Sequence, residues 1–180
     1  MALYRGDARV FKACINTEGM IAMRLYTSYF YQIRNFFPYM IPISTAISDP
    51  LWFRPDKGQE FYTDKKGVAN GLRYEPLIVQ RYCEPVCPCE AKDSTQCSFI
   101  QEYQELLATV DIDATIKAFE HCKEYMKKKL NLEQEPVIVL IVYETPQNKC
   151  SERAALQEFF TSRGHLCTEL EYPIRKENML

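Results

Sequence analysis

The stretch Val137-Ile138-Val139-Leu140-Ile141-Val142-Tyr143 decides the fold of this chain. The stretch follows Pro136, and five of its seven residues are valine or isoleucine. Polar and apolar residues do not alternate along it, so neither face of the strand is marked as exposed. Continuous runs of this kind are typical of strands that are buried on both faces of a parallel sheet. The run therefore predicts an α/β fold in which residues 137–143 form a central strand.

Helical spacing of apolar residues predicts two helices before this strand. In the first, Ser98 and Gln101 form a capping box ahead of an apolar face. In the second, Asp111 or Asp113 caps a longer apolar stripe, which ends in three lysines that suit the helix dipole. The two faces consist of Phe99, Tyr103, Leu106, Leu107 and Val110, and of Ile112, Ile116, Phe119, Cys122, Met126 and Leu130.

A third helix is predicted from about Cys150 to Arg163, where Gly164 is a typical C-cap. His165 to Tyr172 then reads as a last strand. In the first half, Arg24 to Tyr31 and Met40 to Ile47 are predicted strands. Pro42 lacks a backbone N–H, so the second of these must lie at an edge or a strand end.

The order of these elements predicts parallel strands joined by right-handed helical crossovers. We therefore expect a single α/β domain over residues 1–180, with a Rossmann-like arrangement of three layers. Its mostly parallel sheet is flanked by helices and carries a cysteine-rich loop insertion over residues 83–97. Most of residues 48–76 are expected to be loop, because Asp49-Pro50, Arg54-Pro55, Lys57-Gly58 and Lys66-Gly67 are turn signals.

Composition narrows the class of protein. The chain has 180 residues, of which 47% are hydrophobic and 26% charged, and its net charge of −2 provides no global basic field for nucleic acid. Charges interrupt the first residues and no apolar run could span a membrane, so a cytoplasmic protein without membrane contact is expected. Its eight cysteines are then reduced thiols or metal ligands. The 12 tyrosines favour either a ligand-recognition surface or the rim of the core.

The residues that follow the buried strand form the first candidate site. In open α/β sheets, ligands bind beyond the carboxyl ends of the strands, where the next helix also points its free N–H groups. This places Glu144, Cys150 and Arg153 around one anion-binding spot, and a thiol there has a lowered pKa. The alternative is that Cys150 is a buried first-turn residue, that Arg153 pairs with a nearby glutamate (Glu152 or Glu169) and that Glu144 is solvated. The spacing matches neither a phosphatase loop nor a glycine-rich phosphate loop.

The second candidate site is a cluster of cysteines, Cys83, Cys87, Cys89 and Cys97, within fifteen residues. Four thiolates can close a tetrahedral zinc site that would hold together a loop with little apolar content. Plain thiols or a redox pair are the main alternative, and an iron–sulfur cluster is the next. Both histidines, His121 and His165, are expected at the surface or at a helix cap rather than as ligands.

Several short motifs resemble the domain of unknown function 488 family over residues of about 24–172. They are Tyr26-Thr27-Ser28-Tyr29-Phe30, Pro42-Ile43-Ser44, Pro50-Leu51-Trp52-Phe53, Leu140-Ile141-Val142-Tyr143-Glu144 and Cys150-Ser151-Glu152-Arg153. In the family, the last two correspond to a hydrophobic strand, Cys-Tyr-Glu, a short loop, Cys-His-Arg and a helix. Here Val142 replaces the first family cysteine and Ser151 the histidine, and the arginine comes one position later. The resemblance implies a role near nucleotide or DNA metabolism, and the substitutions imply binding without turnover.

These observations predict a protein that binds a nucleotide, or an exposed nucleotide of a nucleic acid, and they leave processing of the nucleotide open. Arg153 and the helix N-terminus would hold the phosphate, Glu144 would act as general acid or base, and Cys150 would be the nucleophile. The other predicted ligand-binding residues are Tyr26, Ser28, Tyr29, Tyr143 and Ser151, with Tyr143 and either Tyr26 or Tyr29 stacking on the base. The rival hypothesis is a non-catalytic, phage-type sequestering or inhibitor protein with a zinc-stapled cysteine loop.

Overall fold

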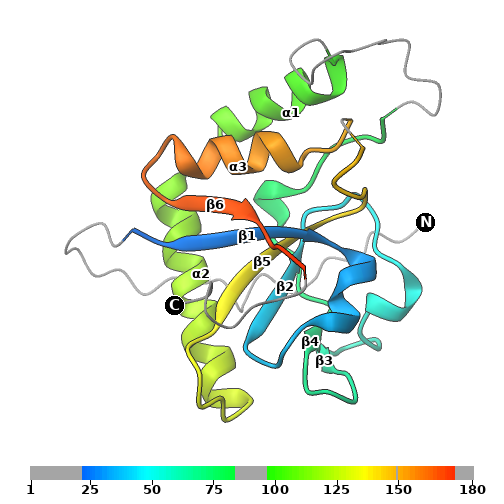
Figure 1. Cartoon of the computed structure of the whole chain (residues 1–180), viewed down its shortest axis with the longest axis vertical. Helices are drawn as coiled ribbons and strands as arrows, with labels where there is room; N and C mark the ends of the chain where they lie inside the picture. Colours follow the sequence, from blue (N-terminus) through cyan, green and yellow to red (C-terminus); the bar gives the residue numbers. More distant parts are fainter. Residues whose placement is uncertain (1–21, 84–96, 149, 173–180) are drawn as a thin grey trace.

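The computed structural model describes residues 22–83, 97–148 and 150–172 (Figure 1). Four strands form a fully parallel sheet in the order β2-β5-β1-β6. The strands are β1 (Arg24–Tyr29), β2 (Met40–Ser44), β5 (Val137–Val142) and β6 (Leu166–Glu169). The predicted α/β class and its mostly parallel, Rossmann-like sheet are therefore confirmed.

Strand β5 lies inside the sheet, paired with β2 on one side and β1 on the other. Ile138, Leu140 and Val142 pack into one hydrophobic cluster, and Val139 and Ile141 pack into a second cluster on the opposite face. Both faces of the strand are thus buried, as the continuous apolar run predicts. Strand β2 is at the edge of the sheet, so it pairs with a neighbour on one side only. Pro42 lacks the backbone N–H that a central strand would need, and the edge position accommodates it.

The α-helices α1 (Ser98–Ala108), α2 (Ile112–Lys129) and α3 (Arg153–Thr161) all contribute to the first cluster. In Figure 1, α1 and α3 run side by side above β6, and α2 crosses behind the strands. The second cluster is covered instead by the 3-10 helices η2 (Phe30–Asn35) and η3 (Leu51–Phe53) and by neighbouring loops. The sheet is therefore flanked by α-helices on one face and by short 3-10 turns on the other.

Several local predictions are confirmed. Asp111 caps α2, since its side chain accepts a hydrogen bond from the Ala114 N–H at 3.0 Å. Gly164, which follows α3, has a φ of 87°, a left-handed conformation that favours glycine at a helix end. Within the described residues, the search for helices long and apolar enough to cross a membrane finds none.

Other local predictions are wrong at their boundaries. Helix α3 begins at Arg153 rather than near Cys150, and β2 ends at Ser44 rather than Ile47. Helix α1 has Cys97 as its N-cap residue with no side-chain hydrogen bond, so Ser98 does not form the predicted capping box. The expected loop over residues 48–76 contains a small hairpin, β3 (Tyr62–Thr63) and β4 (Ala69–Asn70), and η4 (Glu75–Leu77) lies at its end.

His165 is also placed differently from the prediction. Its side chain is buried, and its Nδ1 accepts a hydrogen bond from the Met23 N–H at 3.1 Å, which ties the start of β1 to the turn before β6. The prediction failed because a helix-ending glycine is normally followed by exposed chain, whereas here β6 returns directly into the sheet. His121 is exposed on α2, as expected.

Candidate functional site

Three cysteines from distant parts of the sequence meet beside the sheet. The Sγ atoms of Cys83, Cys97 and Cys150 all lie within 4.8 Å of one another. Cys83 follows the buried segment 77–79, Cys97 is the N-cap residue of α1, and Cys150 precedes the first turn of α3. Three chain segments therefore converge on one point, which we call the thiol cluster.

The geometry of the thiol cluster suits a thiophilic metal ion. In a tetrahedral zinc site with Zn–S bonds of about 2.3 Å, the sulfur atoms are roughly 3.8 Å apart, so small movements would close the site. Cys97 is buried and the other two thiols are half-buried. Burial, and then the neighbouring Cys150 and Cys97 thiols, raise the pKa of Cys83 to about 11. Without a metal, Cys83 is thus a neutral thiol rather than a reactive thiolate.

The thiol cluster agrees with the sequence prediction in part. Cys83 and Cys97 come together as predicted, whereas the predicted ligands Cys87 and Cys89 lie outside the described residues. Cys150, which was predicted as a nucleophile, is the third member. The density of cysteines in the sequence could identify a cysteine-rich loop, but it could not identify Cys150, a thiol that lies far away in the sequence.

Arg153 occupies a buried ion pair at the start of α3. Its Nε lies 2.7 Å from Glu169 Oε2 on β6, and its Nη2 donates to the Glu144 carbonyl oxygen at 2.8 Å. Glu169 also accepts from Thr27 Oγ1 at 2.7 Å, and Thr27 accepts from Gln157 Nε2 at 2.6 Å. This chain of contacts joins α3 to β1 and β6. The sequence left open whether Arg153 binds an anion or pairs with Glu152 or Glu169, and the structure shows it paired with Glu169.

Two carboxyl groups lie beside this ion pair. Glu152 is only 2% exposed, and burial, reinforced by the neighbouring Glu144, raises its pKa to about 8. One carboxylate oxygen of Glu144 is buried without a donor among the described residues. A neutral Glu152 carboxyl is itself a donor, so a proton shared between the two carboxyl groups satisfies both.

Most of the other predicted ligand-binding residues lie inside the protein. Tyr26, Ser28 and Ser151 are buried, and Tyr29 is half-buried with its hydroxyl bonded to Gln32 Nε2 at 2.8 Å. The reason is that β1 lies between two neighbours and is covered on both faces. Tyr143, in contrast, is 61% exposed just beyond the end of β5.

Sequence reasoning missed an aromatic surface near Tyr143. Phe30, which is buried, contacts the ring of Tyr143 edge-on at 6.1 Å between centroids and that of Trp52 at 6.2 Å. Trp52 is 51% exposed, and Tyr31, next to Phe30, is also exposed. We call Tyr31, Trp52 and Tyr143 the aromatic ledge. Trp52 lies in a segment where the sequence predicted turns and a family-like motif, Pro50 to Phe53, but no ligand-binding residue.

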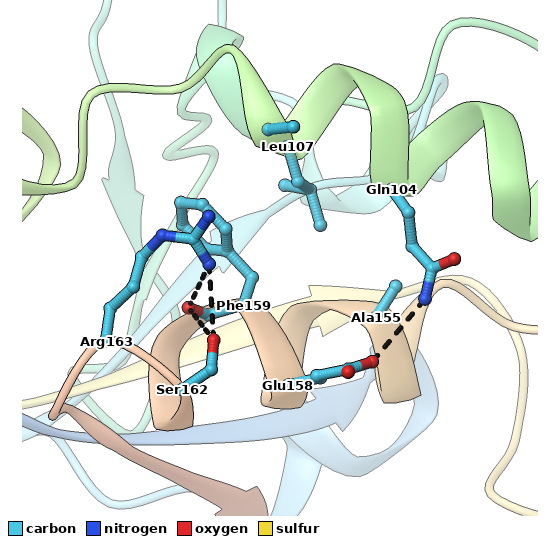
Figure 2. Close-up of a pocket in the computed structure, with 8 residues that line it drawn as sticks. Gln104, Leu107, Ala155, Glu158, Phe159, Ser162 and Arg163 are labelled. Carbon is cyan, nitrogen blue, oxygen red and sulfur yellow. Dashed lines mark hydrogen bonds between the residues drawn. The ribbon is translucent and has the colours of Figure 1, made fainter.

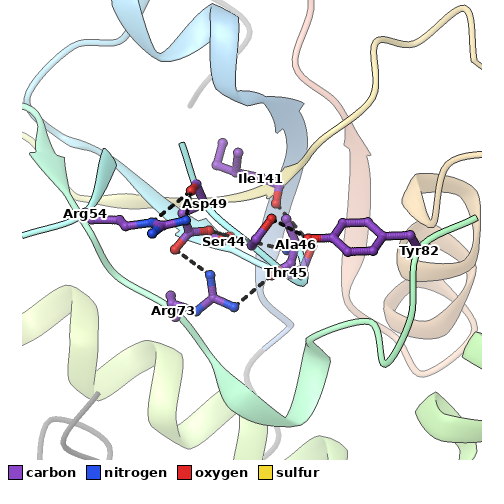
Figure 3. Close-up of polar contacts among 9 residues, drawn as sticks. Ser44, Thr45, Ala46, Asp49, Arg54, Arg73, Tyr82 and Ile141 are labelled. Carbon is purple, nitrogen blue, oxygen red and sulfur yellow. Dashed lines mark hydrogen bonds and ion pairs between the residues drawn. The ribbon is translucent and has the colours of Figure 1, made fainter. Parts of the chain in front are cut away.

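The loop after β2 is held by a buried polar network (Figure 3). Asp49 accepts a hydrogen bond from Ser44 Oγ at 2.5 Å and forms an ion pair with Arg73, while Arg73 also donates to the Ala46 carbonyl at 2.8 Å. Arg54 donates from Nε and Nη2 to the Asp49 carbonyl at 2.9 and 2.6 Å. Because Pro50 to Phe53 lies between Asp49 and Arg54, these bonds fix the turn that carries Trp52.

A groove of about 240 Å³ lies elsewhere, between α1 and the end of α3. Figure 2 shows Leu107 and Gln104 on α1 facing Phe159 and Glu158 on α3. Gln104 Nε2 bonds to Glu158 at 3.4 Å across it, and the Arg163 guanidinium stacks on Phe159 at 4.3 Å. The groove is smaller than most small-molecule sites, and these contacts account for its polar groups.

Comparisons with protein-family models, with curated proteins and with solved structures find no match to this chain. The resemblance to the domain of unknown function 488 family therefore stays a prediction. The function of the chain is inferred below from the thiol cluster and from the residues at the carboxyl edge of the sheet.

Proposed function

We propose that this chain is a zinc-stapled α/β protein that binds a nucleotide or a nucleic acid without transforming it. The observation that carries the metal part is the convergence of Cys83, Cys97 and Cys150 within 4.8 Å. Thiolates favour zinc among the common intracellular metals, and a reducing compartment such as the cytoplasm keeps them available. An iron–sulfur cluster is the less favoured occupant, because it prefers four cysteines in recognisable spacings.

The proposed zinc ion is structural. It would link the segment before residue 84 to the first residues of α1 and to the loop before α3, and so add to the contacts of Arg81 with Glu102 and Phe99. Cys97 is the N-cap residue of α1 and has no side-chain cap bond. A metal-bound thiolate there also interacts favourably with the positive end of the helix dipole. Binding free energy at such a site adds to the stability of the folded domain.

A zinc-bound Cys150 argues for a binder rather than an enzyme. A thiolate that is committed to a metal is less available as a nucleophile, and the raised pKa of the neighbouring Cys83 keeps that thiol neutral in the metal-free state. In addition, Ser151 stands where the resembled family has a histidine, so a proton carrier is missing from that motif. The proposal therefore favours the non-catalytic, sequestering or inhibitor hypothesis over nucleotide processing.

The ligand class is supported by the position of exposed aromatic residues. Tyr143 follows the carboxyl end of β5, and ligands of open α/β sheets bind beyond that edge. An exposed tyrosine ring offers a stacking surface for a base. Arg153 is engaged by Glu169, so the phosphate contact is assigned to other cations rather than to Arg153. The family resemblance points to the same ligand class.

The test of the metal site is the zinc content of purified protein, measured by mass spectrometry after purification without chelators. About one zinc ion per chain is expected, and less than half of that in Cys83→Ala, Cys97→Ala or Cys150→Ala. Cys122→Ala and Cys167→Ala are matched controls, because both thiols are buried and lie outside the cluster, and both should retain zinc.

Two further variants, Cys87→Ala and Cys89→Ala, determine whether either cysteine supplies the fourth ligand. Zinc-free wild-type protein that is folded and reduced would refute the metal site. Equal zinc loss in Cys122→Ala and Cys150→Ala would do the same, because it would show a general effect of destabilisation.

A further inference from the structure

Exposed apolar side chains of this protein gather at one edge of the sheet. Among the described residues, the large exposed hydrophobic side chains are Tyr31, Leu51, Trp52, Tyr82, Tyr143 and Leu166. Tyr31 follows β1, Leu51 and Trp52 follow β2, and Tyr143 follows β5, while Leu166 alone begins a strand. Because the strands are parallel, their carboxyl ends lie at the same edge, so these three connections start there, and the rings of Trp52 and Tyr143 both contact Phe30.

The aromatic ledge is rigidly supported from below. Trp52 and Tyr143 both rest edge-on against Phe30, and Phe53, next to Trp52, is fully buried with its ring 5.2 Å from Phe30. The bonds of Arg54 to the Asp49 carbonyl then fix the turn on its other side. A side chain held in this way loses little conformational entropy when a ligand stacks on it, which favours binding.

Two cations lie beside Tyr31 of the aromatic ledge. The guanidinium of Arg34 stacks on Tyr31 at 3.6 Å, and the Lys66 ammonium bonds to the Arg34 carbonyl, so both exposed positive charges are on the Tyr31 side of the ledge. Of the nearby carboxylates, Asp49 pairs with Arg73, and Asp64 accepts from the N–H groups of Lys66 and Val68. Exposed aromatic rings and exposed cations match a ligand made of bases and phosphates.

The openness of the surface selects among such ligands. The rings of Trp52 and Tyr143 are 51% and 61% exposed, and neither residue lines the groove between α1 and α3. A free nucleotide is normally enclosed in a pocket, whereas single strands stack successive bases on exposed rings along an open, cationic surface. We infer that the aromatic ledge binds single-stranded nucleic acid, with bases on Trp52 and Tyr143 and phosphates on Arg34 and Lys66. This rests on the ligand class proposed above and specifies its form.

The chain provides its own reporter for the test, because Trp52 is its one tryptophan. A twelve-nucleotide strand of thymidines, added to the full-length, zinc-loaded protein at low salt, should quench the Trp52 fluorescence. A dye-labelled copy of the strand should show increased anisotropy with the same midpoint. If two phosphates are contacted, raising the salt from 50 to 500 mM should weaken binding roughly twenty-five-fold.

Variants locate the binding on the ledge. Tyr143→Ala and Trp52→Ala, followed by anisotropy, should each weaken binding about tenfold or more, and Arg34→Gln should weaken it and reduce the salt dependence. Leu166→Ala is the matched control, because it removes an exposed apolar side chain at the opposite edge of the sheet and should bind as the wild type does. Circular dichroism establishes that each variant is folded.

Three results would overturn the inference, and they differ in what they imply for the proposed function. Wild-type binding that Tyr143→Ala and Trp52→Ala leave unchanged places the nucleic acid elsewhere but keeps the ligand class. Quenching by thymidine monophosphate with an affinity equal to that of the strand shows a nucleotide site and likewise keeps the class. Quenching by neither nucleic acid nor nucleotide, or only by an uncharged hydrophobic peptide, refutes both the inference and the ligand class, while the zinc measurement remains independent.

Discussion

Arg153 illustrates how a single side chain can be explained by structure rather than by ligand binding. Its guanidinium contacts the Glu169 carboxylate and the Glu144 carbonyl, and little of it is exposed. Burial raises the pKa of Glu169, whereas its hydrogen bond from Thr27 and the charge of Arg153 lower it. The arginine therefore keeps a partly buried carboxylate charged at the junction of α3, β1 and β6.

We predict that Arg153→Ala reduces the free energy of unfolding by about 2–3 kcal/mol, measured by urea denaturation at pH 7. Breaking a fully buried pair costs roughly 3–5 kcal/mol, and the partial exposure of Glu169 and the imperfect alignment of the contact reduce this figure. Arg163→Ala is the control, since that arginine is exposed and stacks on Phe159, and its loss should cost below about 1 kcal/mol. Equal midpoints for Arg153→Ala and the wild type would show that the ion pair does not stabilise the fold.

At the scale of elements, the connection after β2 is the most strongly determined loop. Asp49 binds Ser44 and Arg73 through its side chain and Arg54 through its carbonyl. The hydrogen bonds and the ion pair of this buried carboxylate fix the backbone around it. The loop thereby positions η3, which presents Trp52.

We predict that Asp49→Asn destabilises the protein by about 2–4 kcal/mol and moves the Trp52 emission to longer wavelength. The substitution removes the negative charge that pairs with half-buried Arg73 and weakens the contact with Ser44 Oγ, which together anchor the start of the turn, whereas the Arg54 bonds to the backbone carbonyl of residue 49 remain. Asp56→Asn, at an exposed position on the same connection, should leave both stability and emission nearly unchanged. An unchanged emission spectrum in a destabilised Asp49→Asn variant would show that the Asp49 network does not hold Trp52 in position.

At the scale of the whole molecule, the thiol cluster connects the two halves of the chain. Cys83 belongs to the first half, Cys97 opens the helical half, and Cys150 follows the central strand. A metal ion bound to the folded protein alone stabilises the whole domain by mass action. Its removal should therefore act globally rather than only on one loop.

We predict that a strong zinc chelator lowers the melting temperature, by about 2–4 °C for each kcal/mol of binding free energy that is lost. Amide hydrogen exchange should rise first in the opening turns of α1 and α3, which are adjacent to Cys97 and Cys150. The Cys150→Ala variant should already melt at the lower temperature and should not respond to the chelator. A chelator response in that variant equal to the wild-type response would place the metal elsewhere.

The sequence by itself determined the features that depend on local pattern. The apolar run of β5, the Asp111 cap of α2, the Gly164 helix end and the edge position required by Pro42 all appear in the structure. Each follows from side-chain periodicity or from the backbone limits of one residue, which a neighbouring segment does not change. The parallel topology followed as well, since alternating helices and strands allow few other arrangements.

Only the tertiary structure decided which distant residues meet. Strand order β2-β5-β1-β6 brings Cys150 to Cys83 and Cys97, pairs Arg153 with Glu169, and brings Trp52 and Tyr143 into contact with Phe30. It also buries Tyr26 and Ser28, which their sequence alone left available for a ligand. Such contacts depend on register, strand order and the packing of whole elements, so they are encoded by the sum of many weak interactions rather than by any short motif.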